Sequence, residues 1–142
     1  MQDKKHPKYC HYGYRYINKQ GPEKDWQYAL QAHRNQNGLH FDLRLAKPGN
    51  THAYSWASRK PPLMAVDKPA LARRTFDHSL DHMDFQGPLK TAKGEGTVKL
   101  LRRGKAKMHS IDDTGIHFIL DSGERFRLVN ISGKKYIIKR EE

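Results

Sequence analysis

The stretch Leu39-His40-Phe41-Asp42-Leu43-Arg44-Leu45 alternates apolar and polar residues from end to end. Successive side chains of a β-strand point to opposite faces of the sheet, so this alternation predicts a strand with one buried face. The apolar side chains lie toward a core, while His40, Asp42 and Arg44 share the other face. The strand therefore has a core face and a polar face.

Strand-like patterns continue on both sides of this stretch. Trp26–Gln31 alternates in the same way and leads into the turn-prone Arg34–Gly38, and His52–Ser58 reads as a returning strand. Later runs of the same kind, separated mostly by glycine-containing turns, are Gly96–Arg102, Lys105–His109, Gly115–Leu120, Arg125–Asn130 and Lys135–Lys139. Short strands at this spacing predict an all-β fold, a compact closed or nearly closed β-barrel, and not βαβ units.

Two segments are less regular. Val66–Arg74 predicts a short helix or an irregular stretch, limited by Pro69. Tyr12–Ile17 alternates, which favours a strand with one buried face over an arm whose tyrosines stack on bases. The sequence has no internal repeat and no linker. The predicted organisation is a weakly patterned N-terminal arm over residues 1–25 and one β-barrel domain over residues 26–142.

The chain of 142 residues is strongly basic, with 27 Lys and Arg against 15 Asp and Glu and a net charge of +12. Its 36% hydrophobic residues suffice for one core. No apolar run approaches the ~18 residues of a membrane helix. The chain has no secretory signal pattern and a lone Cys10, so we expect a cytoplasmic protein without a membrane partner. Nucleic acid is the expected partner, because phosphate contacts release condensed counterions.

The polar face of Leu39–Leu45 carries residues that can bind a metal. His40 and Asp42 present an imidazole and a carboxylate to one side, and His33 can approach His40 across the hairpin as a third ligand. Mixed nitrogen and oxygen donors suit Mn, Zn, Fe or Co better than Ca. Arg44 follows on the same face with a planar fork that suits phosphate. The alternative is the ordinary solvent face of an amphipathic strand.

Another polar group lies in Phe76-Asp77-His78-Ser79, preceded by Arg73 and Arg74. Irregular segments of this kind often present functional groups. Two imidazoles and a carboxylate on a metal, surrounded by cations and a further imidazole, suit phosphate-ester chemistry. The metal would polarise a phosphoryl oxygen or activate water, and the cations would stabilise the developing charge.

Several motifs in chain order go beyond these single residues. They are Gln31-Ala32-His33, Leu39–Leu45, Ser55-Trp56-Ala57, Lys60-Pro61-Pro62, Asp77-His78-Ser79-Leu80, Asp84-Phe85-Gln86-Gly87 and Gly94-Glu95-Gly96-Thr97-Val98. Together they resemble the 3′-phosphoesterase domain of bacterial and archaeal DNA ligase D proteins. The resemblance extends in order from Trp26 to Glu142, which makes it more specific than any one motif.

The resemblance implies a β-barrel enzyme that depends on a divalent metal, typically Mn, and processes DNA or RNA 3′ ends during end joining. Such enzymes remove a terminal ribonucleoside and hydrolyse a 3′-phosphate to a hydroxyl. The residues that match the family's site are the metal ligands His33, His40 and Asp42, the phosphate contacts Arg44 and His78, and their polar neighbour Gln31. In this assignment Arg44 neutralises phosphate charge, and His78 stabilises the transition state or protonates the leaving oxygen.

The chain departs from the family pattern at several positions. His82 stands where the family has a site tyrosine, and it can still donate a hydrogen bond. Ala70 stands where an arginine is expected, so nearby Arg73, Arg74 or Lys68 would have to supply the charge. Phe76 replaces an acidic residue. The family's N-terminal Arg-Asp and Glu elements have no counterpart before Trp26.

Two hypotheses remain. The first is a stand-alone, metal-dependent phosphoesterase of DNA repair, acting as 3′-phosphatase, 3′-ribonuclease or both, with a DNA ligase, polymerase or Ku-type end-binding protein in trans. The second is a degenerate, non-catalytic nucleic-acid-binding module of the same fold. In both, the cations expected to contact nucleic acid are Arg73, Arg74, Arg102 and Arg103.

Overall fold

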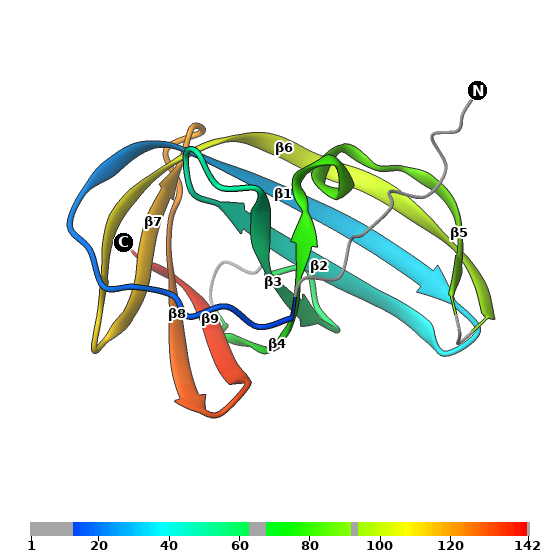
Figure 1. Cartoon of the computed structure of the whole chain (residues 1–142). Helices are drawn as coiled ribbons and strands as arrows, with labels where there is room; N and C mark the ends of the chain where they lie inside the picture. Colours follow the sequence, from blue (N-terminus) through cyan, green and yellow to red (C-terminus); the bar gives the residue numbers. More distant parts are fainter. Residues whose placement is uncertain (1–12, 63–67, 92–93, 142) are drawn as a thin grey trace.

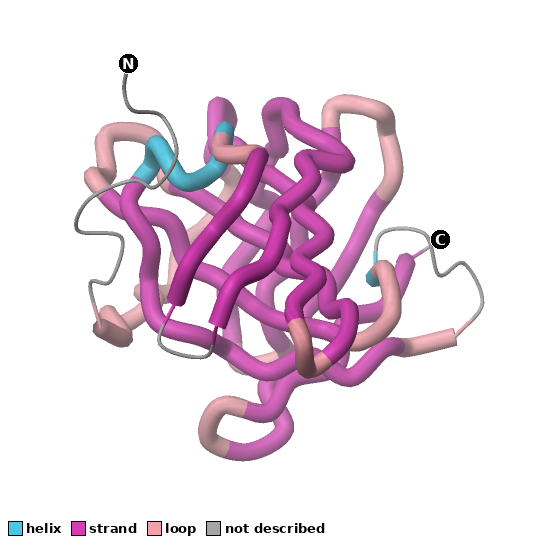
Figure 2. The backbone as a smooth tube through the Cα atoms, turned by 90° about the vertical axis from the view of Figure 1, so that its right-hand side faces the viewer, coloured by secondary structure: helices cyan, strands magenta, loops and turns pink. Residues whose placement is uncertain are grey.

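Antiparallel strands make up most of the computed structural model, which describes residues 13–62, 68–91 and 94–141. Within this part of the chain the strands are β1 (Glu23–Asn35), β2 (Gly38–Ala46), β3 (His52–Ser58), β4 (Ala70–Ser79), β5 (Gly87–Thr91), β6 (Gly94–Asp112), β7 (Gly115–Leu120), β8 (Arg125–Ser132) and β9 (Lys135–Glu141). The 3₁₀ helix η2 (Leu80–Asp84) follows β4. Figure 2 shows how little of the backbone is helical.

The strands form a closed ring. They pair in the order β1-β2-β3-β4-β9-β8-β7-β6, and a further pairing of β1 with β6 closes the ring, while β5 adds to the free edge of β6. The long β1 and β6 cross the whole molecule beside each other in Figure 1. This arrangement confirms the predicted all-β fold and its closed or nearly closed barrel.

The ring encloses the hydrophobic core. Its apolar rows come from alternate strand positions, such as Tyr28 and Leu30 on β1, Leu43 and Leu45 on β2, and Trp56 on β3, all nearly inaccessible to solvent. Alternation places every second residue of the same strands on the outer face. The outer face of β1 to β4 is therefore free to carry other chemistry.

A second, smaller layer covers part of that outer face. Small residues there, Ala29, Ala46 and Ala53, pack against Met83 of η2. A separate apolar group of Phe85, Leu89 and Val98 joins β5 to the start of β6. Small side chains on the strands let η2 approach the sheet closely, and a groove remains between the two layers.

The predicted approach of His33 to His40 across the hairpin of β1 and β2 is confirmed, since the two residues lie directly opposite each other. The predicted bounds of His52–Ser58 and Gly115–Leu120 are confirmed. The predicted break at Gly104 is wrong, because β6 runs through it without interruption. A Cβ at Gly104 would collide with the Asp121 carboxylate, so this glycine allows a close approach inside a strand.

Two other local predictions fail in the described residues. The helix or irregular stretch expected over Val66–Arg74 is wrong from Ala70 onward, because β4 begins there and pairs with β3 and β9. The strand expected over Tyr12–Ile17 is wrong for residues 13–17, where Tyr14 and Tyr16 are exposed and Ile17 packs against the core. Residues 1–12, and residues 66 and 67 of the first of these segments, lie outside the described part of the chain.

The segment 13–22 packs across the open edge of β4. Gly13 accepts a backbone hydrogen bond from Asp77, and the amide of Arg15 donates to the buried Asp77 carboxylate at 3.2 Å. Farther on, Gln20 pairs with Ile111 of β6. In the described residues no helix has the length and apolar character needed to cross a membrane.

Substitution of Gly115 tests how closely the strands of the ring pack. Its φ is 129°, and an added Cβ would collide with the backbone carbonyl of Leu128 on β8. We expect Gly115→Ala to lower the free energy of unfolding by about 2–4 kcal/mol, because backbone strain and overpacking add. Gly123→Ala, with φ of 96° and open space around it, should cost only about 1 kcal/mol. Urea unfolding compares the two, and equal losses would contradict the packing argument.

Candidate functional site

Three side chains that can bind a metal converge on the outer face of β1 and β2. The donor atoms of His33, His40 and Asp42 all lie within 4.8 Å of one another. His33 and His40 are directly paired across the hairpin, and their rings meet edge to face at 4.8 Å. The third member follows by strand alternation, since Asp42 lies two residues beyond His40 on the same face. We call these residues the triad.

Two of the three residues of the triad have the protonation state that a metal ligand needs, a neutral imidazole and an ionised carboxylate. Burial, reinforced by the charge of His40, lowers the pKa of His33 and leaves its imidazole neutral. Burial alone would raise the pKa of Asp42, but the hydrogen bond from His40 and the charge of Arg44 together lower it. Asp42 therefore stays ionised. The hydrogen bond to Asp42 raises the pKa of His40, with Nε2 and Oδ2 3.2 Å apart.

Arg44 is buried beside the triad and is surrounded by hydrogen-bond acceptors. Its Nε donates to Gln31 Oε1 at 2.7 Å, and its Nη1 donates to Ser55 Oγ at 2.8 Å and lies 3.1 Å from His78 Nδ1. Its Nη2 lies 3.7 Å from Asp42 Oδ2. The planar guanidinium is thus held by contacts on several sides, and a cation is fixed next to the triad.

Gln31 ties the site to the covering layer. Its side chain has no exposed surface, and its Nε2 donates to the backbone carbonyls of His82 at 2.8 Å and Phe85 at 2.9 Å. Its Oε1 accepts from Arg44, so both ends of the amide are in use. Gln31 therefore positions Arg44 and η2, and it is not available to a substrate.

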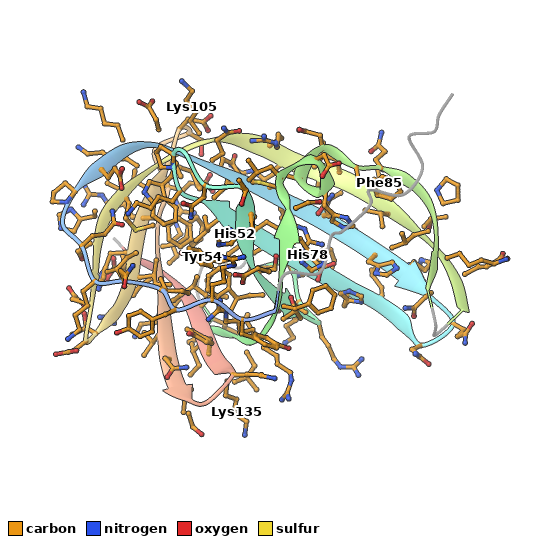
Figure 3. The ribbon with its side chains drawn as sticks, in the orientation of Figure 1. His52, Tyr54, His78, Phe85, Lys105 and Lys135 are labelled. Carbon is orange, nitrogen blue, oxygen red and sulfur yellow. The ribbon has the colours of Figure 1, made fainter. Side chains whose placement is uncertain are left out.

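His78 and Asp42 lie against the two terminal nitrogens of the Arg44 guanidinium, His78 at Nη1 and Asp42 at Nη2. An arginine can only donate, so Nδ1 of His78 accepts and the neutral ring carries its proton on Nε2. Burial, together with the charge of Arg44, lowers the pKa of His78 to about 2. Phe76 stacks on the ring at 4.5 Å, and His82 lies 4.8 Å away. Figure 3 shows His78 on β4, on the side of the sheet toward Phe85.

These groups open into a cavity of about 650 Å³. This volume falls within the range of small-molecule sites and exceeds what a phosphate group alone needs. Besides the triad, Arg44 and His78, its walls include Arg59, Arg73, Phe76, His82, Leu89 and Val98. The cavity thus combines a polar wall from β2 with an apolar wall from β5 and β6.

The other residues singled out in the sequence differ in whether they reach this cavity. Arg73 lines the cavity, whereas Arg74 donates to the Asp77 carboxylate and to the carbonyl of Arg15, away from it. Ala70 belongs to the core cluster inside the ring. The predicted nucleic-acid contacts on β6 have carboxylate partners, with Arg102 Nη2 2.7 Å from Glu124 Oε1 and Arg103 Nε 2.8 Å from Asp84 Oδ1.

Sequence reasoning did not identify Ser55 and Asp77 as functional. Ser55 Oγ accepts from Arg44 and lies 3.2 Å from His78 Nδ1. Its position between Ala53 and Ala57 on the outer face of β3 is a signal that could have revealed it. Asp77 is fully buried, anchors the segment 13–22 and immediately precedes His78. Only the folded chain reveals that role, since its partners are distant in sequence.

The low pKa of His78 makes a prediction about stability. Below its ordinary pKa of 6.5 the unfolded chain takes up a proton that the folded chain does not, so stability falls as pH falls from 6.5 toward 2. At about pH 5 this loss amounts to about 2 kcal/mol relative to pH 7. We expect His78→Gln to remove most of that loss, measured by urea unfolding in chelator. His109→Gln, at an exposed position of β6, is the control. Equal pH dependence in His78→Gln and the native chain would refute the assignment.

Comparison with known proteins agrees with this geometry. Residues 31–135 match the family description "DNA Ligase D 3′-phosphoesterase domain". The chain is also 35% identical over 88 residues to the "Multifunctional non-homologous end joining protein LigD" of Pseudomonas aeruginosa. That alignment covers 58% of this chain and 10% of the relative, so the chain corresponds to a small part of the larger protein.

Proposed function

Because the chain belongs to the DNA ligase D 3′-phosphoesterase domain family, we propose that it is a divalent-metal-dependent phosphoesterase that processes 3′ ends of DNA or RNA. The observation that carries the proposal is the convergence of the triad beside the buried Arg44 and His78. The family membership supports a phosphoesterase of end joining. The metal, the reactions and the roles of single residues are our proposal.

The residues present fit a divalent transition metal. His33 offers a neutral imidazole and Asp42 an ionised carboxylate, and His40 becomes a ligand once its proton is displaced. Such a donor set suits Mn, Zn or Co, and we favour Mn from the family resemblance. When bound, the metal would polarise a phosphoryl oxygen or activate water for attack on phosphorus.

The remaining steps belong to this chain's own side chains. Arg44, already fixed by Gln31 and Ser55, would hold a phosphate oxygen and offset the charge that builds up in the transition state. His78 would donate its Nε2 proton as a hydrogen bond. Its low pKa makes it a poor imidazolium acid at neutral pH, so we favour transition-state stabilisation over protonation of the leaving oxygen. His82 and Phe76 would close the site around the substrate.

The test is release of inorganic phosphate from a primer-template with a 3′-phosphate, and of a nucleoside from one with a 3′-terminal ribonucleotide. We expect turnover with Mn and none with chelator. Phosphate release without nucleoside release would restrict the activity to 3′-phosphatase. Release that is unchanged by chelator would refute the metal-dependent proposal.

One observation favours the non-catalytic alternative. Phe76 stacks on His78 where the family has an acidic residue, and the apolar ring removes a polar group from the site. The complete triad opposes this alternative, since a binding module has no need of it. Salt-sensitive binding to nucleic acid without turnover on any blocked 3′ end would establish the alternative.

The setting of the proposed activity is end joining, which is what the name of the Pseudomonas relative describes. We propose that the chain acts there on DNA or RNA ends beside a DNA ligase, a polymerase or a Ku-type end-binding protein. Pull-down of such enzymes with the purified chain, with and without a 3′-phosphate end, would examine this part of the proposal.

A further inference from the structure

A row of cations leads away from the cavity across three strands. Arg73 of β4 lies directly opposite Ala57 of β3 on one side and opposite Lys135 of β9 on the other. Arg59 follows Ala57 by two residues, and both Arg59 and Arg73 line the cavity. We call Arg59, Arg73 and Lys135 the cationic row.

Two members of the row are like charges in direct cross-strand register. Residues opposite each other in an antiparallel pair project to the same face with Cβ atoms about 5 Å apart, and like charges there destabilise the sheet. Arg73 and Lys135 stand in this relation, and in the described residues neither has a carboxylate within ion-pair distance. Such repulsion is relieved when an anion binds between them.

Three cations of β6 differ in this respect. Arg102 and Arg103 each hold a carboxylate, and Lys105 lies 3.6 Å from Asp25. Much of the positive charge on that side is therefore already neutralised. The described cations that border the cavity without such a partner, Arg59 and Arg73, belong to the row.

The row begins at the triad and ends at the tip of the β8–β9 hairpin. Arg59 lines the same cavity as the three residues of the triad, so the row begins beside them. Lys135 opens β9 at the lower end of the hairpin in Figure 3, and Asn130 donates to its carbonyl at 3.2 Å. The next cation, Lys134, lies 3.9 Å from the centre of the half-exposed Tyr14 ring.

From this arrangement we propose that the cationic row is the track for the nucleic-acid strand that ends in the cavity. The 3′ terminus lies at the triad, and the preceding phosphates lie on Arg59, Arg73 and Lys135 in that order. Tyr14 and Lys134 flank the far end, where a base can stack beside a cation. This inference rests on the proposed function for the identity of the strand's end.

The salt dependence of binding tests the track. A single-stranded oligonucleotide with a 3′-hydroxyl is titrated in chelator, so that no turnover takes place. Each lost phosphate contact reduces the slope of log affinity against log salt by about 0.7. We expect Arg73→Gln/Lys135→Gln to reduce the slope by about 1.4, and Lys135→Gln alone, an exposed single change, to reduce it by about 0.7.

The matched control removes two cations that already have carboxylate partners. Lys19 lies 2.7 Å from Asp113 and Lys105 lies 3.6 Å from Asp25, so Lys19→Gln/Lys105→Gln gives the same net charge and should keep the native slope. An equal drop in this control would overturn the track, because it would show a diffuse charge effect. A drop in Arg102→Gln/Arg103→Gln without one in Arg73→Gln/Lys135→Gln would move the binding face to β6 and also overturn it.

The slope is independent of catalysis. A chain that shows the predicted slopes but releases no phosphate with Mn would support the track and refute the proposed phosphoesterase. A chain that releases phosphate while Arg73→Gln/Lys135→Gln keeps the native slope would refute the track alone.

Discussion

Asp42→Asn is expected to lower Mn-dependent phosphate release by about 10³-fold, equivalent to about 4 kcal/mol of transition-state stabilisation. The amide keeps the shape of the side chain but loses the negative charge that the triad offers to a cation. His40 also loses the ionised hydrogen-bond partner that now lies 3.2 Å away. Phosphate release and Mn affinity, the latter by calorimetric titration, would be measured on the same preparation. We expect the variant to lose both.

The control for this change is Asp113→Asn. Asp113 is an exposed carboxylate that pairs with Lys19 at 2.7 Å, so the chemistry of the substitution is the same without the site. It should leave phosphate release and Mn affinity at native values. A folded Asp42→Asn protein that binds Mn and turns over within tenfold of the native rate would remove the triad from the mechanism.

Arg44→Lys is the second change with a large expected effect. A lysine ammonium cannot reach Gln31, Ser55 and His78 together, so buried acceptors lose their donor and the fixed charge beside the triad becomes mobile. We expect phosphate release to fall by about 10²- to 10³-fold. The unpaired acceptors should also lower the free energy of unfolding by about 1–3 kcal/mol.

Turnover and urea unfolding, measured separately, distinguish the loss of activity from the loss of stability. Turnover is compared at a temperature where urea unfolding shows the variant fully folded, so reduced stability alone cannot lower the rate. Arg125→Lys, at an exposed position of β8, controls for the substitution and should be silent in both assays. Native turnover in folded Arg44→Lys would show that a general positive charge suffices and that the planar fork has no role.

Local pattern predicted the part of the fold that depends on alternation. The strict period of Leu39–Leu45 predicted the core face of β2, its polar face and the approach of His33 to His40, all of which the structure contains. These features depend on neighbours along one hairpin. The closing contact of β1 with β6 depends on residues far apart in the sequence, and no local pattern encodes that pairing.

Glycine residues lie at the positions where the sequence pattern and the observed strands disagree. Glycine usually interrupts strands, which predicts a break at Gly104, yet this residue lies in the middle of β6, opposite Tyr28. Its reason is the Asp121 carboxylate that occupies the space of a Cβ, which only the packed structure reveals. The strand β5, with two of its five residues glycine and proline, gave no strand pattern either.

The sequence predicted the types of residue that form the candidate site, but it did not predict their hydrogen bonds and ion pairs. The motif resemblance selected Gln31 as a polar neighbour, but its partners are the backbone carbonyls of His82 and Phe85, which carry no sequence signal. Likewise, the ion pairs of Arg102 and Arg103 depend on Glu124 and Asp84 from other segments. Counting charges along the chain could not distinguish these neutralised cations from Arg73.

Because β2 has a core face and a site face, the hairpin is sensitive to the register of this strand. Leu43 and Leu45 belong to the core, and His40, Asp42 and Arg44 belong to the site, within a single strand. One residue inserted inside β2 would exchange the two rows, placing charges among the aromatic residues and leucines at the ligand positions. Polar substitution of Phe41, Leu43 or Leu45 should therefore give insoluble protein, whereas substitution of His40, Asp42 or Arg44 should give folded but inactive protein. An insertion or deletion is therefore compatible with the fold in a loop beside β2 but not within β2 itself.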